Sequence, residues 1–547
     1  MHKATVSTLF EGHGTFYQRM IRKNGDESYE PLGEIGDFKF TIEKKSRFSN
    51  NQYMATVYHD DDNELSQPIS IQMELLYCKE YSSVHWSTKI DKKIEDLAFR
   101  FIDIKDFPAV NVMSRCVEVY NQCIYAIMTG TDVPDTSDEW YQYMAPANTR
   151  TIINEDDEKP IYAFDINSAS QMQTGGGNIC FSHAMHLNRA LILRKHGDNA
   201  NSLEMLALPV QDQKGRFSKS LEKIVVDGVD STIKGSLMDA TEHKLMVFGG
   251  EQNKIGEIDL ERGKVVQEYN PGNKSIVSVA YSAKTADNSN GVYTCLAPNV
   301  AFNIDTRMDP RSCVVLESGK DLDSYSLKSA KPLTCHATSK AGHLATGDSI
   351  GNVRLYTGPP GSRKPGGGHF PKTAKTLLDT KTPILSLDIT ANGSHILATC
   401  ENFILLINTK YLDNDGKEAD GFKTRMGKHK PTPLRLLPSA LQIEEMKSMD
   451  EVRFTSAKFD VDTSTGEHCV TASCGKFLLV WSMNALIKAE EKNRNAPCDM
   501  VSVGHTALSI NTPQSSTVTY LSKDNIGSIP IEESKRSFRK WTWGQRD

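Results

Sequence analysis

The chain has 547 residues, of which 38% are hydrophobic and 24% charged, and its formal net charge is −6. This composition is typical of a folded globular protein and excludes a chain that is disordered throughout. No run approaches the roughly 18 apolar residues of a membrane-spanning helix, so no transmembrane segment is expected. The acidic balance opposes attraction of the whole chain to polyanions, and we expect no nucleic-acid partner.

The cysteine pattern indicates the redox environment in which the protein is found. Eleven cysteines are scattered without paired short spacings, and residues 1–20 contain no apolar stretch after a basic start. Both features argue against secretion and favour a reducing environment. We therefore expect a cytoplasmic protein.

Residues 1–130 are expected to form a small α+β domain. Strand-like segments precede one helical pattern from Phe107 to Met128. The segments are Phe38 to Ile42, Gln52 to Tyr58, Ile69 to Tyr77 and Leu97 to Ile104. Within the helix, apolar residues recur at intervals of three or four and would form one buried stripe. They are Val112, Cys116, Val119, Cys123 and Ile127. Strands capped by one helix predict a pleckstrin-homology-like domain.

Residues 131–160 are polar and acidic, which predicts a solvated interdomain linker in which the aromatic piece Trp140 to Met144 docks locally. Beyond it, a unit of apolar strand, turn and second apolar strand recurs about every fifty residues. Its clearest copy is His343 to Tyr356. The second strands end in a common register at Leu208, Ile258, Ile304, Tyr356, Ile407, Trp481 and Pro530.

This period predicts a WD40-like β-propeller over residues 161–533, because several short strands per repeat of roughly 40 to 50 residues are typical of propeller blades. Seven endings indicate seven blades. The aspartate, histidine, serine and tryptophan residues that form a hydrogen-bonding network in typical WD repeats are largely missing from the sequence. Six or eight blades therefore remain alternatives. The fold class is mainly β.

Two basic segments are candidate partner-binding sites. The interval between Ile407 and Trp481 is longer than the others and contains an insertion at residues 411–449. Insertions in repeat folds form loops on one face, where binding is common. Residues 534–547 form a basic aromatic tail whose tryptophans and arginines could anchor in a partner. The candidate residues are Lys423, Arg425, Lys428, Lys430 and Arg435 in the insertion and Arg539, Trp541 and Trp543 in the tail.

The insertion also carries a family resemblance. Residues Asn408 to Leu437 resemble the signature of the vacuolar import and degradation protein 27 family, through Asp415-Gly416-Lys417, Gly421-Phe422 and Arg425-Met426-Gly427. The similarity extends through Pro383 to Thr399 and Ala472 to Trp481. It implies an intracellular protein with a pleckstrin-homology-like domain ahead of a propeller. It implies no catalytic residues.

Residues that could carry other chemistry have simpler structural roles. Asp388 and Asp460 end comparable strands and could hold a metal in a propeller hydrolase, but aspartates at blade turns commonly accept backbone hydrogen bonds. His183 and His186 have no further ligands at zinc-site spacing, and Cys469 and Cys474 fit small core positions. The sequence therefore predicts no enzyme activity, cofactor or metal.

Lys44, Lys45 and Arg47 lie between the first two predicted strands, where lipid-binding pleckstrin-homology domains collect cations. Phosphoinositide is thus a candidate ligand. The sequence favours a non-enzymatic protein–protein interaction scaffold, as a subunit of a larger intracellular assembly. The alternative is a peripheral membrane adaptor in vesicle or protein-degradation traffic.

Overall fold

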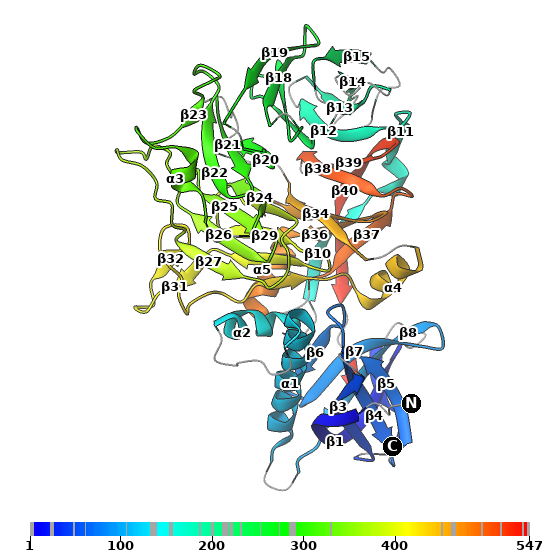
Figure 1. Cartoon of the computed structure of the whole chain (residues 1–547). Coiled ribbons are helices and arrows are strands. Elements are labelled where there is room, and N and C mark those ends of the chain that lie inside the picture. The colour runs from blue at the N-terminus through cyan, green and yellow to red at the C-terminus, as the bar shows by residue number, and fades with distance from the viewer. Residues whose placement is uncertain are drawn as a thin grey trace.

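The structure is a computed structural model. It describes residues 5–543 apart from residues 22–26, 35, 48–49, 61, 105–106, 132–138, 153–156, 185–186, 198–201, 211–216, 218–221, 230–231, 252, 273, 284–290, 329–330, 450–451, 461–465, 494–495, 515–516 and 539–540. Figure 1 shows an N-terminal domain beside a larger ring of sheets.

The N-terminal domain is built on a mostly antiparallel ten-stranded sheet in which β1 pairs with both β3 and β8 and so joins its two halves. The order is β5-β4-β3-β1-β8-β7-β6-β9, with β2 and β41 off this path. The strands are β1 (Thr5–Ile21), β2 (Glu27–Pro31), β3 (Phe38–Arg47), β4 (Asn50–His59), β5 (Asp62–Pro68), β6 (Leu75–Cys78), β7 (Ser83–Ile90), β8 (Lys93–Phe101), β9 (Thr149–Thr151) and β41 (Trp541–Trp543).

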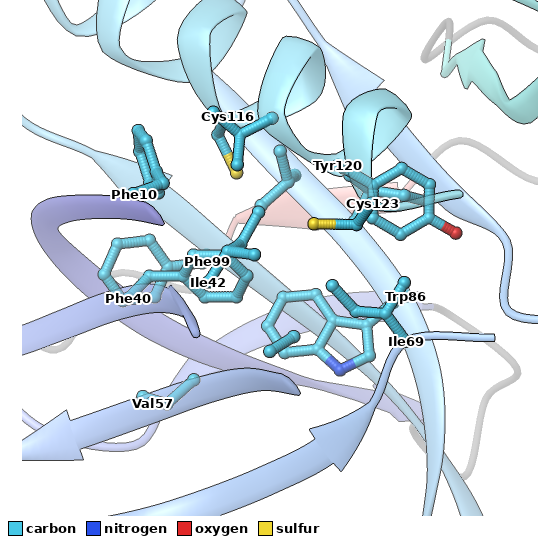
Figure 2. Packing of buried hydrophobic residues seen from close by; sticks show 14 of the residues in the cluster. Phe10, Phe40, Ile42, Val57, Ile69, Trp86, Phe99, Cys116, Tyr120 and Cys123 are labelled. Carbon is cyan, nitrogen blue, oxygen red and sulfur yellow. The ribbon is translucent and has the colours of Figure 1, made fainter. Parts of the chain in front are cut away.

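Helix α1 (Ala109–Thr129) covers one face of this sheet. Figure 2 shows Cys116, Tyr120 and Cys123 directed from the helix toward Phe99 and Trp86 of the sheet. The predicted stripe is the buried one, since Val112, Cys116, Val119 and Cys123 are all buried. The sequence did not indicate β1, whose 17 residues mix polar and apolar side chains. The pleckstrin-homology-like assignment stays a prediction.

A short connector links the two parts. It contains α2 (Glu139–Met144), the 3-10 helix η1 (Ala145–Asn148) and β9, which runs parallel to β6. Trp140, Tyr143 and Met144 are buried. The aromatic side chains of this described part fill the space between α1 and the propeller, so the piece Trp140 to Met144 docks against the chain as the sequence indicated.

The first four blades are four-stranded antiparallel sheets in chain order. They are β12 (Asn178–Ala184), β13 (Arg189–Lys195), β14 (Ser202–Pro209) and β15 (Glu222–Asp227); β16 (Gly235–Met238), β17 (Lys244–Phe248), β18 (Ile255–Asp259) and β19 (Lys264–Tyr269); β20 (Ser278–Tyr281), β21 (Val292–Ala297), β22 (Val300–Asp305) and β23 (Val314–Val315); and β24 (Leu333–Thr338), β25 (Leu344–Asp348), β26 (Asn352–Tyr356) and β27 (Thr376–Asp379). Helix α3 (Leu322–Tyr325) follows β23.

Blades 5 and 6 carry additions between their third and fourth strands. Blade 5 is β28 (Ser386–Ile389), β29 (His395–Thr399), β30 (Ile404–Asn408) and β33 (Leu434–Leu436), with the hairpin β31 (Lys410–Leu412) and β32 (Glu418–Asp420) inserted. Blade 6 is β34 (Phe454–Phe459), β35 (Cys469–Cys474), β36 (Phe477–Ser482) and β37 (Cys498–Ser502). Helix α4 (Ala440–Met449) precedes blade 6, and α5 (Met483–Lys492) follows β36.

The seventh blade closes the ring with strands from both ends of the propeller sequence. It consists of β38 (Ala507–Gln514), β39 (Thr517–Ser522) and β40 (Asn525–Phe538), completed by β10 (Asp157–Phe164) and β11 (Ser170–Gln173). The 3-10 helix η2 (Ile166–Ser168) lies between the last two. Both β10 and β11 pair with β40, so the first propeller strands are fixed to the last. Such closure gives each blade a neighbour on both sides.

The blade register confirms the repeat found in the sequence. Each of the seven predicted endings lies in the third strand of a different blade, from Leu208 in β14 to Pro530 in β40. Six four-stranded sheets and one five-stranded sheet make seven blades. The fold is a seven-bladed, mainly β, WD40-like propeller, and the alternatives of six or eight blades are wrong.

Candidate interaction surfaces

The insertion lies on the surface of blades 4 and 5 and is anchored by buried side chains. Phe422 and Met426, in the loop after β32, are 0% and 1% exposed. Thr357 of blade 4 donates a hydrogen bond to the carbonyl oxygen of Phe422 at 2.7 Å, and Thr376 donates one to Gly421 at 3.0 Å. These contacts fix the loop to the propeller, so it presents its polar side chains in a defined geometry.

The predicted cations of the insertion divide into two groups. Lys423, Arg425 and Lys428 are exposed. The Lys430 side chain, 10% exposed, instead pairs with Glu139 of α2 at 2.6 Å. Its ammonium also lies 5.3 Å from the ring centre of Tyr143. The structure thus keeps three of these cations at the surface and uses Lys430 inside the chain.

Arg435, in the outer strand β33, is the second cation with an internal role, at 3% exposure. Its Nη1 donates a hydrogen bond to Asn148 Oδ1 of the connector at 3.1 Å, and its guanidinium carbon lies 4.9 Å from the ring centre of Phe403. Burial lowers the pKa of Arg435 to about 10. This arginine therefore joins the propeller to the connector, and the sequence could not distinguish it from the exposed cations.

Further polar contacts bind the N-terminal domain to the propeller. Thr151 N donates to the carbonyl oxygen of Asn493, just after α5, at 2.9 Å. The Tyr143 hydroxyl donates to the carbonyl oxygen of Asp379, and Lys89 of β7 pairs with Glu444 of α4. Figure 1 shows α2 between α1 and the propeller on one side of the junction, with α4 on the other side. The two parts of the chain are joined by both apolar and charged groups.

The predicted tail also lies against the chain itself. Strand β41 runs parallel to β2, with Trp543 opposite Tyr29. The Trp543 ring is 4.4 Å from Tyr17 and 5.5 Å from Tyr29, centre to centre. Arg539 and the side chain of Trp541 lie outside the described residues. Sequence reasoning did not single out Tyr17 or Tyr29, because nothing in a linear sequence pairs residues so far apart.

The predicted lipid-binding residues lie on β3. Lys44 and Lys45 are both half-buried, and they pair with Tyr53 and Gln52 of β4. Because neighbouring residues of a strand point to opposite faces of the sheet, these two lysines do not converge on one side. The side chain of Arg47 lies outside the described residues.

The two aspartates considered for metal binding accept backbone hydrogen bonds. Asp388 Oδ2 accepts from Phe459 N of the next blade at 2.9 Å, and Asp460 Oδ1 accepts from His468 N at 2.8 Å. Burial lowers the pKa of His183 to about 4, and His186 lies outside the described residues. Within the part of the chain that the structure describes, no three His, Cys, Asp or Glu side chains form a group able to hold a metal ion. Among the described helices, none has the length and apolar character needed to cross a bilayer.

The fold and surfaces define a WD40-like propeller protein with an attached N-terminal domain. The family model described as "VID27 C-terminal WD40-like domain" matches residues 208–496, more than half of the chain. The chain therefore belongs to the vacuolar import and degradation protein 27 family, as the insertion signature predicted.

Two relatives share this name. The "Vacuolar import and degradation protein 27" of Saccharomyces cerevisiae is 23% identical over 355 residues, which cover 62% of this chain and 41% of the relative. That of Schizosaccharomyces pombe is 26% identical over 286 residues, covering 50% and 33%. The matched part thus spans less than half of either relative. Among solved structures, the Cps50 (Swd1) β-propeller domain of Myceliophteria thermophila has a TM-score of 0.43 at 12% identity, covering 66% of this chain and 98% of that domain.

Proposed function

We propose that this chain is a non-enzymatic protein–protein interaction scaffold and a subunit of a larger cytoplasmic assembly. A WD40-like propeller is a fold suited to protein interaction, because a closed ring is rigid and its loops carry the variable surface. The observation that carries the proposal is the trio Lys423, Arg425 and Lys428, exposed on a loop whose neighbours Phe422 and Met426 are buried.

The charge of this trio indicates the kind of partner. The whole chain has a net charge of −6, whereas these three cations fall within six residues of one loop. Complementary charge speeds association and selects among partners more than it raises affinity. An acidic protein surface is the partner that fits. The adjoining hairpin adds an exposed apolar side chain, Leu412, which is 62% exposed.

The experiment is affinity purification of the full chain and of a variant with Lys423→Glu, Arg425→Glu and Lys428→Glu. A matched control reverses three exposed cations elsewhere, Arg262, Lys264 and Lys340, and so changes the net charge equally. We expect the insertion variant to lose a set of acidic partners that the control retains. Recovery of the same proteins with all three chains would refute the proposed surface.

The alternative is a peripheral membrane adaptor, and the word "import" in the relatives' name is what favours it. Its proposed cations have weaker support, since Lys44 and Lys45 point to opposite faces of the sheet. Sedimentation with phosphoinositide-containing liposomes tests it directly. Binding that disappears on changing Lys44, Lys45 and Arg47 to alanine supports the adaptor, and unchanged or absent sedimentation rejects it.

A further inference from the structure

The sheet of the N-terminal domain has a second face, opposite the one that α1 covers. Side chains alternate along each strand, so Phe16 and Phe99 enter the core beneath α1 while their neighbours Tyr17 and Arg100 face the other way. Tyr17 is 6% exposed. Other side chains must therefore cover Tyr17 on the face of the sheet opposite α1.

The cover is Trp543 of β41. Its ring lies in an aromatic pocket built from four strands or turns of the N-terminal domain. The ring-centre distances are 4.4 Å to Tyr17, 5.5 Å to Tyr29, 5.6 Å to Tyr81 and 6.0 Å to His85, and the guanidinium carbon of Arg100 is 5.8 Å from the ring centre. Edge-to-face aromatic contacts and a stacked guanidinium are the arrangement by which interfaces hold a tryptophan.

The backbone reinforces the pocket. Strand β2 pairs with β1 on one side, and β41 adds to its other side in parallel. Addition of an extended segment to a sheet edge, with one side chain in a pocket, is a recurring mode of peptide recognition. Among the described residues, three pairs form this ladder, from Glu27–Trp541 to Tyr29–Trp543. The ladder places Trp543 beside Tyr29, so the strand pairing and the aromatic contacts act together.

The carboxylates of this edge are already engaged within the domain. Glu27 of β2 pairs with Arg19 of β1 at 2.6 Å, and Glu30 accepts a hydrogen bond from the Ser28 hydroxyl at 2.6 Å. Selection by this site therefore depends on the aromatic side chain that enters it and on the strand pairing.

We propose that this pocket is a peptide-binding site for an extended segment carrying a tryptophan, and that residues 541–543 occupy it in cis. A partner with a segment of the same chemistry would displace β41 and so join the N-terminal domain to another protein. The site is distinct from the basic loop of the insertion, and the inference does not depend on that loop.

Fluorescence anisotropy with a labelled peptide of residues 536–546 tests the site. The receptor is the chain ended after Phe538, which keeps the pairing of β10 with β40 and removes residues 539–547, which include β41. We expect saturable binding to this receptor, and at least about tenfold weaker binding to the full chain, where the pocket is filled. The peptide with Trp543→Ala has the same charge and should bind at least about tenfold more weakly.

Two receptor variants locate the site, Tyr81→Ala and Arg100→Ala, whose side chains are not part of the core. Each should weaken binding about threefold to tenfold. In case the shortened chain does not fold, the full chain with Trp543→Ala opens the same pocket without a deletion. If neither receptor binds the peptide, or if both peptides bind equally, the pocket is not a peptide site.

Discussion

Arg435 of β33 donates a hydrogen bond to Asn148 of η1 across 287 residues of sequence, at 3.1 Å. Both residues are buried, at 3% and 8% exposure. Among the described residues, Nε and Nη2 of Arg435 have no hydrogen-bond acceptor. The guanidinium is held instead by the ring of Phe403 and the single bond to Asn148. This pair marks the junction of the propeller with the connector.

Shortening Arg435 should destabilise this junction. Arg435→Ala leaves a cavity against Phe403 and an unpaired buried amide oxygen on Asn148, so we expect the free energy of unfolding to fall by about 2 to 4 kcal/mol. Arg435→Met keeps most of the volume and removes a poorly solvated charge, and should cost about 1 to 2 kcal/mol less. Urea unfolding followed by fluorescence measures both. Equal losses for the two variants would show that packing against Phe403 is unimportant.

Phe422 and Lys423 are neighbours with opposite environments, which makes them a matched pair. The Phe422 ring is fully buried and stacks on His343, with centres 4.8 Å apart. Phe422→Ala should lower the free energy of unfolding by about 3 to 5 kcal/mol, while Lys423→Ala should change it by less than about 0.5 kcal/mol. Equilibrium denaturation of the two variants tests this. A small effect of Phe422→Ala would mean that the insertion is not anchored to blade 4.

Where pattern determines burial, the sequence predicts the structure well. The third strands of the blades recur with a buried apolar residue near their ends about every fifty residues, apart from the interval that holds the insertion, so the endings from Leu208 to Pro530 could be predicted. The helical stripe through Val112 and Cys116 was equally clear, because an apolar period near four residues has one structural solution.

The candidate sites were less accessible to sequence reasoning. A residue's charge does not indicate whether its side chain is buried. The sequence therefore could not distinguish the buried cations Lys430 and Arg435 from the exposed ones, because their burial depends on contacts with the connector. Likewise, the aromatic tail suggested a partner, but its contact with β2 joins residues more than 500 positions apart. Such long-range pairing depends on the tertiary fold and has no local signal.

Stability should fall in mild acid because of buried histidines. His336 is enclosed between blades: its Nε2 lies 3.0 Å from the Thr294 carbonyl oxygen and its Nδ1 lies 2.7 Å from the Ser278 hydroxyl. A carbonyl only accepts, so Nε2 carries the proton of a neutral ring and Ser278 donates to Nδ1. Burial lowers the pKa of His336 to about 4, and it lowers the pKa of His183 to about 4 as well.

The direction in which stability changes with pH follows from the protons that each state binds. Between about pH 6.5 and pH 4, the unfolded chain holds protons on these rings that the folded chain does not hold, so the free energy of unfolding decreases as pH falls. Each ring contributes a slope of about 1.4 kcal/mol per pH unit, which levels off below the folded-state pKa. Denaturation at several pH values should show a smaller slope for His336→Gln and for His183→Gln. An unaltered slope in both variants would contradict the neutral, buried state.

The cysteines give a further readout of packing. All eleven are free and buried. Burial raises the pKa of both Cys123 and Cys400 to about 12. Because the thiolate is the reactive form, a disulfide reagent at about pH 8 should label the folded chain slowly and all the thiols at once in denaturant. Mass spectrometry of the labelled peptides gives the order of reaction. Prompt labelling of Cys123 in the folded chain would show that α1 leaves its sheet, whereas labelling of Cys400 alone would place the opening at blade 5.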